Sequence, residues 1–136
     1  MTSTAIDRDA LACKLFVDST VGALELLRAI EARFGPQVGF STIAAAFGEI
    51  DVRRNEDHVE RSRRAVADDF VYFRCYLDIV PSAAIGRDAY VSGVAEVISF
   101  LRAQEWPTVA SCDFEEELPQ PFGKSPRAPT EGSRGG

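Results

Sequence analysis

Residues 70–81, FVYFRCYLDIVP, alternate between two sets of side chains, and this pattern predicts a β-strand with one buried face. The buried set is Val71, Phe73, Cys75, Leu77 and Ile79, and the opposite set is Phe70, Tyr72, Arg74, Tyr76 and Asp78. One face of such a strand belongs to the core and the other to the surface. Any fold of this chain must therefore contain a sheet that is covered on one side.

Three further stretches are rich in strand formers or alternate in the same way. They are residues 13–19 (CKLFVDS), 48–55 (GEIDVRRN) and 108–118 (TVASCDFEEEL). Two apolar stripes at helical spacing predict helices between them. The first contains Ala23, Leu24, Leu27, Ile30 and Phe34, with Ser19 or Thr20 as N-cap and Gly35-Pro36 as its stop. The second begins near Asp88, contains Val91, Val94, Ile98 and Leu101, and ends at Trp106-Pro107.

The order of these elements is β-α-β-β-α-β, which predicts an α+β fold. Two β-α-β halves with right-handed crossovers form a ferredoxin-like sandwich, in which one antiparallel sheet carries two helices on one face. Residues 37–47 could add a strand, a short helix or an irregular connection. We expect residues 1–118 to form this single domain and residues 119–136, rich in proline and glycine, to form a disordered tail.

The formal net charge of −6 at pH 7 excludes several classes of partner. An acidic domain repels phosphate backbones and anionic lipids, so nucleic acid and membrane surfaces are poor partners, and a basic protein is a good one. No apolar run reaches the length of about 20 residues that a membrane span needs. The N-terminus also lacks the apolar segment of a signal peptide, so we expect a cytoplasmic protein.

The sequence offers no convincing catalytic or metal-binding constellation. Cys13, Cys75 and Cys112 are widely separated and form no CxxC motif, which is typical of reduced structural thiols in a reducing compartment. The only histidine, His58, lies in a charged stretch without a partner at a ligand or catalytic spacing. No glycine-rich phosphate loop is present. We therefore expect no metal, no cofactor and a non-catalytic protein.

The uncovered sheet face is the predicted binding surface. In the ferredoxin-like order the first and third strands are central, which places Phe16, Tyr72 and Tyr76 in mid-sheet with Arg74 beside them. Aromatic side chains surrounded by charges are typical of protein-binding surfaces. Asp113, Glu115 and Glu117 share one face of the last predicted strand. This acidic strip either deters aggregation at the sheet edge or steers a basic partner.

Segments such as EIDVRRNED, DDFVYFRCYLDI and VASCDFEEELP belong to a small, acidic, single-domain chain that resembles the immunity proteins of bacterial toxin systems. The resemblance lies in size, charge and composition over residues 1–118. It implies a protein that neutralises a toxin by placing acidic groups over a basic substrate cleft. The alternative is a dimeric α/β-barrel protein, a homodimer with Phe16, Tyr72 and Tyr76 at its interface. Such a dimer would enclose a small-molecule pocket, in some cases that of a cofactor-independent enzyme.

Overall fold

The computed structural model describes residues 8–55 and 73–119. Its elements follow the order α1 (Arg8–Leu11), β1 (Cys13–Val17), α2 (Ala23–Phe34), β2 (Thr42–Ala45), β3 (Gly48–Arg54), β4 (Cys75–Pro81), α3 (Arg87–Ala103), β5 (Thr108–Ser111) and the 3-10 helix η3 (Glu115–Glu117). The predicted tail, residues 119–136, lies outside the described residues from position 120 onward.

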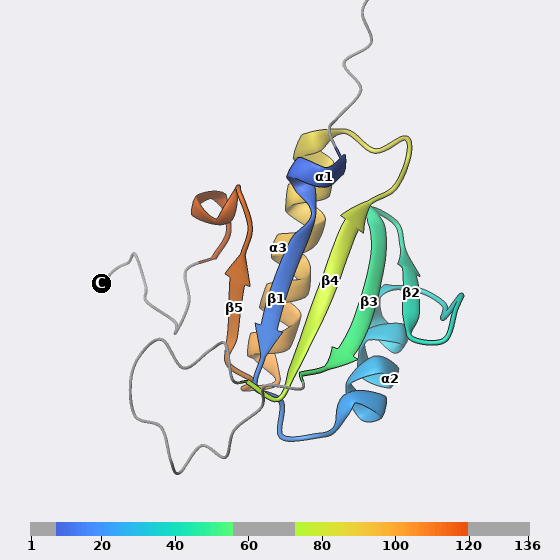
Figure 1. The fold of residues 1–136 in the computed structure, drawn as a ribbon, viewed down its shortest axis with the longest axis vertical. Helices are drawn as coiled ribbons and strands as arrows, with labels where there is room; N and C mark the ends of the chain where they lie inside the picture. The colour runs from blue at the N-terminus through green and yellow to red at the C-terminus, as the bar shows by residue number, and fades with distance from the viewer. Residues whose placement is uncertain (1–7, 56–72, 120–136) are drawn as a thin grey trace, which may run out of the picture.

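The five strands form one sheet in the order β2-β3-β4-β1-β5, and every neighbouring pair is antiparallel. Figure 1 shows α2 and α3 behind this sheet, so both long helices cover the same face. The predicted α+β class with one antiparallel sheet is confirmed. The stretch 37–47 adds a fifth strand, β2, because Ile43 pairs with Ile50 of β3 and is fully buried beneath α2.

Strand β4 has the alternation that its sequence predicted. Phe73, Cys75, Leu77 and Ile79 are buried, whereas Tyr76 and Asp78 are half-buried on the other side. The strand begins at Cys75 rather than at residue 70, since residues 73–74 form a bend. Residues 70–72 of the predicted strand, Tyr72 among them, lie outside the described residues.

Helix α2 spans the predicted stripe, but its N-cap is Gly22 and not Ser19 or Thr20. Both hydroxyls have other partners. Ser19 Oγ donates to Val21 O at 2.6 Å, and Thr20 Oγ1 accepts a hydrogen bond from Trp106 Nε1 at 3.0 Å. The helix ends at the expected place, because Gly35 has a φ of 151° that side chains rarely adopt.

Helix α3 begins at Arg87, one residue before the predicted start, and supplies much of the core. Its predicted apolar stripe is buried, and Val94, Ile98 and Leu101 are fully inaccessible to solvent. They face the inward side chains of the sheet, such as Leu15 and Leu77, which are also fully buried. The space between the sheet and the helices is therefore filled by apolar side chains.

The predicted last strand, residues 108–118, is wrong beyond Ser111, where β5 ends. Among the described strands β5 pairs with β1 alone, and β1 begins at Cys13 after a non-strand residue. A β5 that continued beyond Cys112, the position opposite Cys13, would consequently find no residue of β1 to pair with. The chain instead turns into η3, which buries Phe114 and Leu118 in the core.

Candidate functional site

The side of the sheet that faces away from α2 and α3 is turned toward the viewer in Figure 1. Strand phase places charged and aromatic side chains on this side. We call it the outer sheet face and define it by seven residues: Lys14, Phe16, Glu49, Asp51, Arg53, Tyr76 and Asp78. Strand register arranges most of them in two rows across the sheet. One row runs Asp51, Asp78, Lys14 and the other runs Arg53, Tyr76, Phe16.

An aromatic pair lies at the centre of this face. The ring centroids of Phe16 and Tyr76 are 6.3 Å apart at an interplanar angle of 53°, and both side chains are half-buried. The ammonium group of Lys14 lies 4.3 Å from the Tyr76 centroid and 5.9 Å from that of Phe16. Cation–π attraction thus positions Lys14 over the pair and covers part of its apolar surface.

Two aspartates flank the pair on neighbouring strands. Asp51 accepts hydrogen bonds from Ser41 Oγ and from Arg53 Nε, the latter at 2.7 Å, so its charge is well compensated. Asp78 lies directly opposite both Asp51 and Lys14 in the strand register. Burial raises the pKa of Asp78 and the Asp51 charge adds to this shift, whereas Lys14 opposes it. Asp78 is therefore a carboxylate whose charge the fold leaves poorly solvated.

The structure brings together two of the predicted binding residues, Phe16 and Tyr76. Arg74 directly precedes β4 and does not join the aromatic pair. Its Nε instead donates a hydrogen bond to Ser19 O at 2.9 Å. Its backbone N–H donates to Asp18 Oδ1 at 3.3 Å. Arg74 thus connects the start of β4 to the segment that leads from β1 to α2. Tyr72 lies outside the described residues.

The predicted acidic residues do not lie on a strand. Asp113 is in a turn and Glu115 and Glu117 are in η3, and all three are exposed. Glu117 forms a two-pronged ion pair with Arg87 at the start of α3, with distances of 3.0 and 2.6 Å. The hydrogen bond from Arg87 lowers the pKa of Glu117. The acids consequently form a separate group beside the end of β5, apart from the aromatic pair.

Lys14 and Asp78 are the members of the outer sheet face whose importance the sequence reasoning missed. The signal was present, since both positions share the strand phase of Phe16 and Tyr76. A second missed feature is the position of Cys13 opposite Cys112, which continues the register of β1 and β5. Sequence spacing could not indicate it, because it depends on the pairing of the first and last strands.

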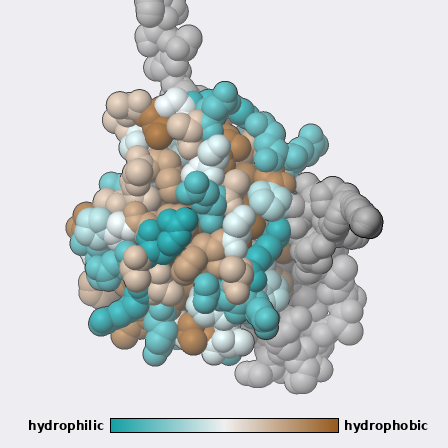
Figure 2. Space-filling view, turned by 180° about the vertical axis from the view of Figure 1, so that it is seen from behind, coloured by the Kyte–Doolittle hydropathy of each residue, from teal (hydrophilic) through white to brown (hydrophobic). Residues whose placement is uncertain are grey.

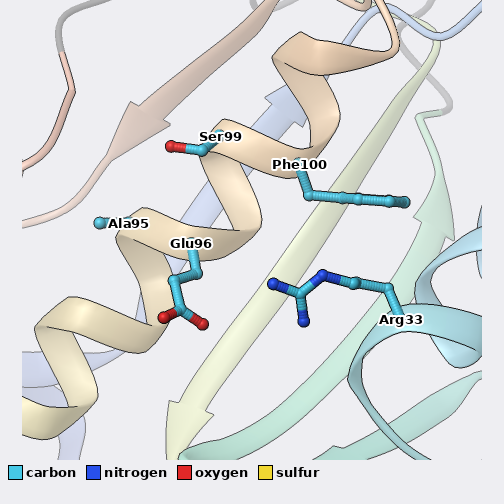
Figure 3. A pocket seen from close by; sticks show the side chains of 5 residues that line it. All are labelled: Arg33, Ala95, Glu96, Ser99 and Phe100. Carbon is cyan, nitrogen blue, oxygen red and sulfur yellow. The ribbon is translucent and has the colours of Figure 1, made fainter.

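The helix-covered side has a different character. Hydrophilic and hydrophobic residues are interspersed on it (Figure 2). An open groove of about 370 Å³ lies between the two long helices and is lined by Arg33, Ala95, Glu96, Ser99 and Phe100. Arg33 extends from α2 toward α3, while Phe100 extends from α3 toward α2 (Figure 3). This groove combines one cation with one carboxylate on the outer surface of the helical layer.

Neither a metal-binding cluster nor a membrane-spanning helix is found in the described part of the chain. Residues 8–55 and 73–119 hold no group of three or more His, Cys, Asp or Glu side chains that could bind a metal ion. No helix within these two ranges is long and apolar enough to cross a membrane. The chain matches no protein-family model, no curated protein and no solved structure at a significant level.

Proposed function

We propose that this protein is a non-catalytic interaction module that binds a basic partner protein through the outer sheet face. The observation that carries the proposal is the half-buried Phe16–Tyr76 pair at the centre of a sheet face rimmed by carboxylates. Aromatic side chains in the middle of a surface are the usual anchors of protein interfaces, and a charged rim surrounds them.

The charges of this face support a basic partner. Arg53 is already paired with Asp51, and Lys14 is held over the aromatic rings. Asp78 and Glu49 lack an ion pair of this kind among the contacts between described residues. Burial leaves the Asp78 carboxylate poorly solvated, and a lysine or arginine of a partner beside it would stabilise its negative charge. The separate group of exposed acids at Asp113 and Glu115–Glu117 adds negative charge to the molecule and would increase the rate of association with a basic protein.

A finer assignment of the fold accompanies this proposal. We propose that β1, α2, β3, β4, α3 and β5 make up a ferredoxin-like unit and that β2 is an addition to its edge. Without β2 the order of strands is β3-β4-β1-β5, in which each helix connects two strands that are separated by one other. This arrangement supports two interlocked β-α-β units.

The more specific form of the proposal is an immunity protein that neutralises a basic toxin domain. It is supported by the acidic charge of −6 in a chain of 136 residues, together with the aromatic anchors. The alternative is a homodimer of the α/β-barrel type that pairs through the outer sheet face. The same aromatic pair supports it. The three carboxylates of the face weigh against it, since burying them between two copies costs desolvation energy.

The test begins with the molar mass of the full chain by size-exclusion chromatography with light scattering, at low and moderate salt. A monomer of 14.8 kDa leaves the outer sheet face accessible to another protein. Binding partners are then captured from the native host on the immobilised chain, and each affinity is measured with purified protein. A partner that binds more weakly as salt rises fits the proposed steering by charge.

The decisive comparison uses the double variant Phe16→Ala/Tyr76→Ala. We expect it to weaken partner binding by about 2–4 kcal/mol, roughly 30- to 1000-fold in Kd, if these rings are hot spots. The control is Leu24→Ala/Val38→Ala, which removes side chains that are each 58% exposed and lie away from this face. Unchanged binding by a folded double variant refutes the assignment of the surface. A salt-resistant wild-type dimer that the double variant converts to a monomer establishes the dimeric alternative.

A further inference from the structure

Two cysteines that are 99 positions apart in the sequence meet at one end of the sheet. Cys13 is the first residue of β1, and Cys112 directly follows the last residue of β5. These strands pair Leu15 with Ala110 and Lys14 with Ser111, so the next position along places Cys13 opposite Cys112. Cys13 has the strand phase of the buried Leu15, and Cys112 that of Ala110, so both thiols lie on the helix-covered side.

The two cysteines lie beside each other at the edge of the core. Cys13 belongs to the apolar core cluster, and the half-buried Cys112 packs against that cluster. Residues directly opposite in an antiparallel pair have Cα atoms about 4.5–5.5 Å apart, and disulfides join Cα atoms about 4.4–6.8 Å apart. A bond between the two sulfur atoms therefore requires side-chain rotation and little movement of the backbone.

The two thiols have unequal chemical environments. The neighbouring Cys13 thiol lowers the pKa of Cys112, burial opposes this shift, and the backbone N–H of Phe114 adds to it. The neighbouring Cys112 thiol and burial raise the pKa of Cys13, which is 3% exposed. The Glu115 carboxylate disfavours the thiolate at both positions but does not reverse the order. Cys112 is also the more accessible thiol, because it is only half-buried.

We propose that Cys13 and Cys112 form a redox-reactive dithiol site that a hydroperoxide oxidises to a disulfide across β1 and β5. The Cys112 thiolate attacks one peroxide oxygen, which forms an S–O bond and breaks the O–O bond with release of hydroxide. Cys13 then attacks the sulfur of this sulfenic acid, so the S–S bond forms and the S–O bond breaks. The departing hydroxide takes the Cys13 proton. The hydroxide or alkoxide released in the first step takes the proton that Cys112 lost. Two electrons thus pass from the thiols to the peroxide, so hydrogen peroxide leaves as two molecules of water and an alkyl hydroperoxide as one alcohol and one water.

The third cysteine provides an internal control. Cys75 is fully buried and pairs with Val17, at the end of β1 opposite to Cys13. The four-residue separation along this strand corresponds to roughly 13 Å. Its sulfur accepts a hydrogen bond from Ser19 Oγ at 3.8 Å, and burial raises the pKa of Cys75. We expect Cys75 to remain reduced while the other two cysteines react.

The experiment treats the reduced full-length chain with hydrogen peroxide, blocks remaining thiols under denaturing conditions and maps the peptides by mass spectrometry. The expected product is one chain with Cys13 linked to Cys112, lighter by two hydrogens, with Cys75 alkylated. Dithiothreitol should restore all three thiols, and the Cys75→Ala variant should give the same linkage. The oxidised chain should melt roughly 5–15 °C higher, because the bond closes a long loop.

Two variants test the order of the steps. Cys13→Ser keeps a hydrogen-bond donor beside Cys112, so oxidation should stop at the sulfenic acid and be trapped by dimedone. Cys112→Ser should leave Cys13 unoxidised at the same peroxide dose. The proposal is overturned if wild-type Cys112 proceeds to the sulfinic acid without a disulfide, or if the linkage involves Cys75 or a second chain. It is equally overturned if all thiols stay reduced at a dose that oxidises free glutathione.

Discussion

Tyr90 is a single residue through which α1, β4 and α3 are joined. Its hydroxyl lies 2.6 Å from Leu11 O and 3.0 Å from Ile79 O, both within the core. Its ring packs 5.8 Å from that of Phe114 and 6.4 Å from that of Phe47. Burial raises the pKa of Tyr90, so the hydroxyl remains a proton donor to these carbonyl groups.

Removing the Tyr90 hydroxyl should lower the stability of the folded protein. We expect Tyr90→Phe to lower the free energy of unfolding by about 1–3 kcal/mol, because two buried carbonyl oxygens lose the one hydroxyl proton that they share. Urea unfolding followed by circular dichroism measures the change. The matched control is Tyr76→Phe, which removes a hydroxyl from the half-exposed outer sheet face. Equal stability of the two variants would contradict the importance of the Tyr90 hydrogen bonds.

The charge of Asp78 should make stability depend on pH. Burial raises the pKa of Asp78 in the folded protein, so the folded state binds its proton more tightly than the unfolded state does. Stability from this group is present below the unfolded pKa of about 3.9 and is lost as pH rises through the raised folded value. Asp78→Asn should therefore increase the Tm at pH 7 relative to wild type, with a smaller gain near pH ~3.

Glu117 should make stability depend on pH in the direction opposite to that of Asp78, which the same Tm measurements can show. Its ion pair with Arg87 lowers the pKa of Glu117, so its contribution is present at neutral pH and is lost as pH falls through the folded value. Glu117→Gln should lower the Tm slightly at pH 7 and leave it unchanged once the carboxyl group of the wild type is protonated. Parallel Tm–pH profiles of wild type and Asp78→Asn would disprove the interpretation of Asp78.

At the scale of elements, the contact between α3 and the β2–β3 turn depends on one missing side chain. Phe47, which is 6% exposed, packs against Gly93 of α3 and at 6.3 Å from the ring of Phe34. A Cβ atom on Gly93 would lie 2.2 Å from Cγ of Phe47. Gly93 thus provides the space in which the aromatic ring of the hairpin docks on the helix.

Gly93→Ala should consequently destabilise the protein although alanine is the better helix former. Helix propensity favours alanine by about 1 kcal/mol, and overpacking against Phe47 should outweigh it for a net loss of about 1–3 kcal/mol. Chemical denaturation measures the net effect, with Ser92→Ala on the exposed side of α3 as control. Adding Phe47→Leu should recover part of the loss. A Gly93→Ala variant that is more stable than the wild type would show that the Phe47 ring moves aside at little cost in free energy.

The elements that local pattern predicted are those whose own side chains alternate or recur. For this reason β3 lies within one residue of its predicted limits. Helix α3 begins one residue before its predicted start, although it ends at Ala103, before the predicted stop at Trp106-Pro107. For residues 37–47 the sequence allows a strand, a short helix or a connection, because Thr42 and Ile43 favour strands and the alanines that follow do not. Pairing with β3 decides for the strand β2. The predicted last strand is too long because the alternation of its side chains continues through Phe114. Its partner β1, by contrast, has no residue that could pair beyond Cys112.

At the scale of the whole molecule, the sequence predicts those parts of the candidate site that depend only on which strands are neighbours in the sheet. Phe16 and Tyr76 were expected to be neighbours because the first and third predicted strands adjoin, and their rings are in contact. The contact of Cys13 with Cys112 needed the register of the first and last strands, which sequence spacing does not contain. Asp113 was assigned to the sheet because the length of β5 depends on a partner far away in the sequence.

The position of β1 between β4 and β5 has a consequence for the way in which the protein is made. β1 leaves the ribosome first, yet one of its two neighbours begins only at Thr108. Until then a growing chain exposes one hydrogen-bonding edge of its central strand, and the loop that must close is nearly as long as the domain. Folding of this sheet therefore waits for β5 and should be slow, since distant contacts delay the rate-limiting step. The nascent chain is most open to strand addition by other chains just before β5 appears.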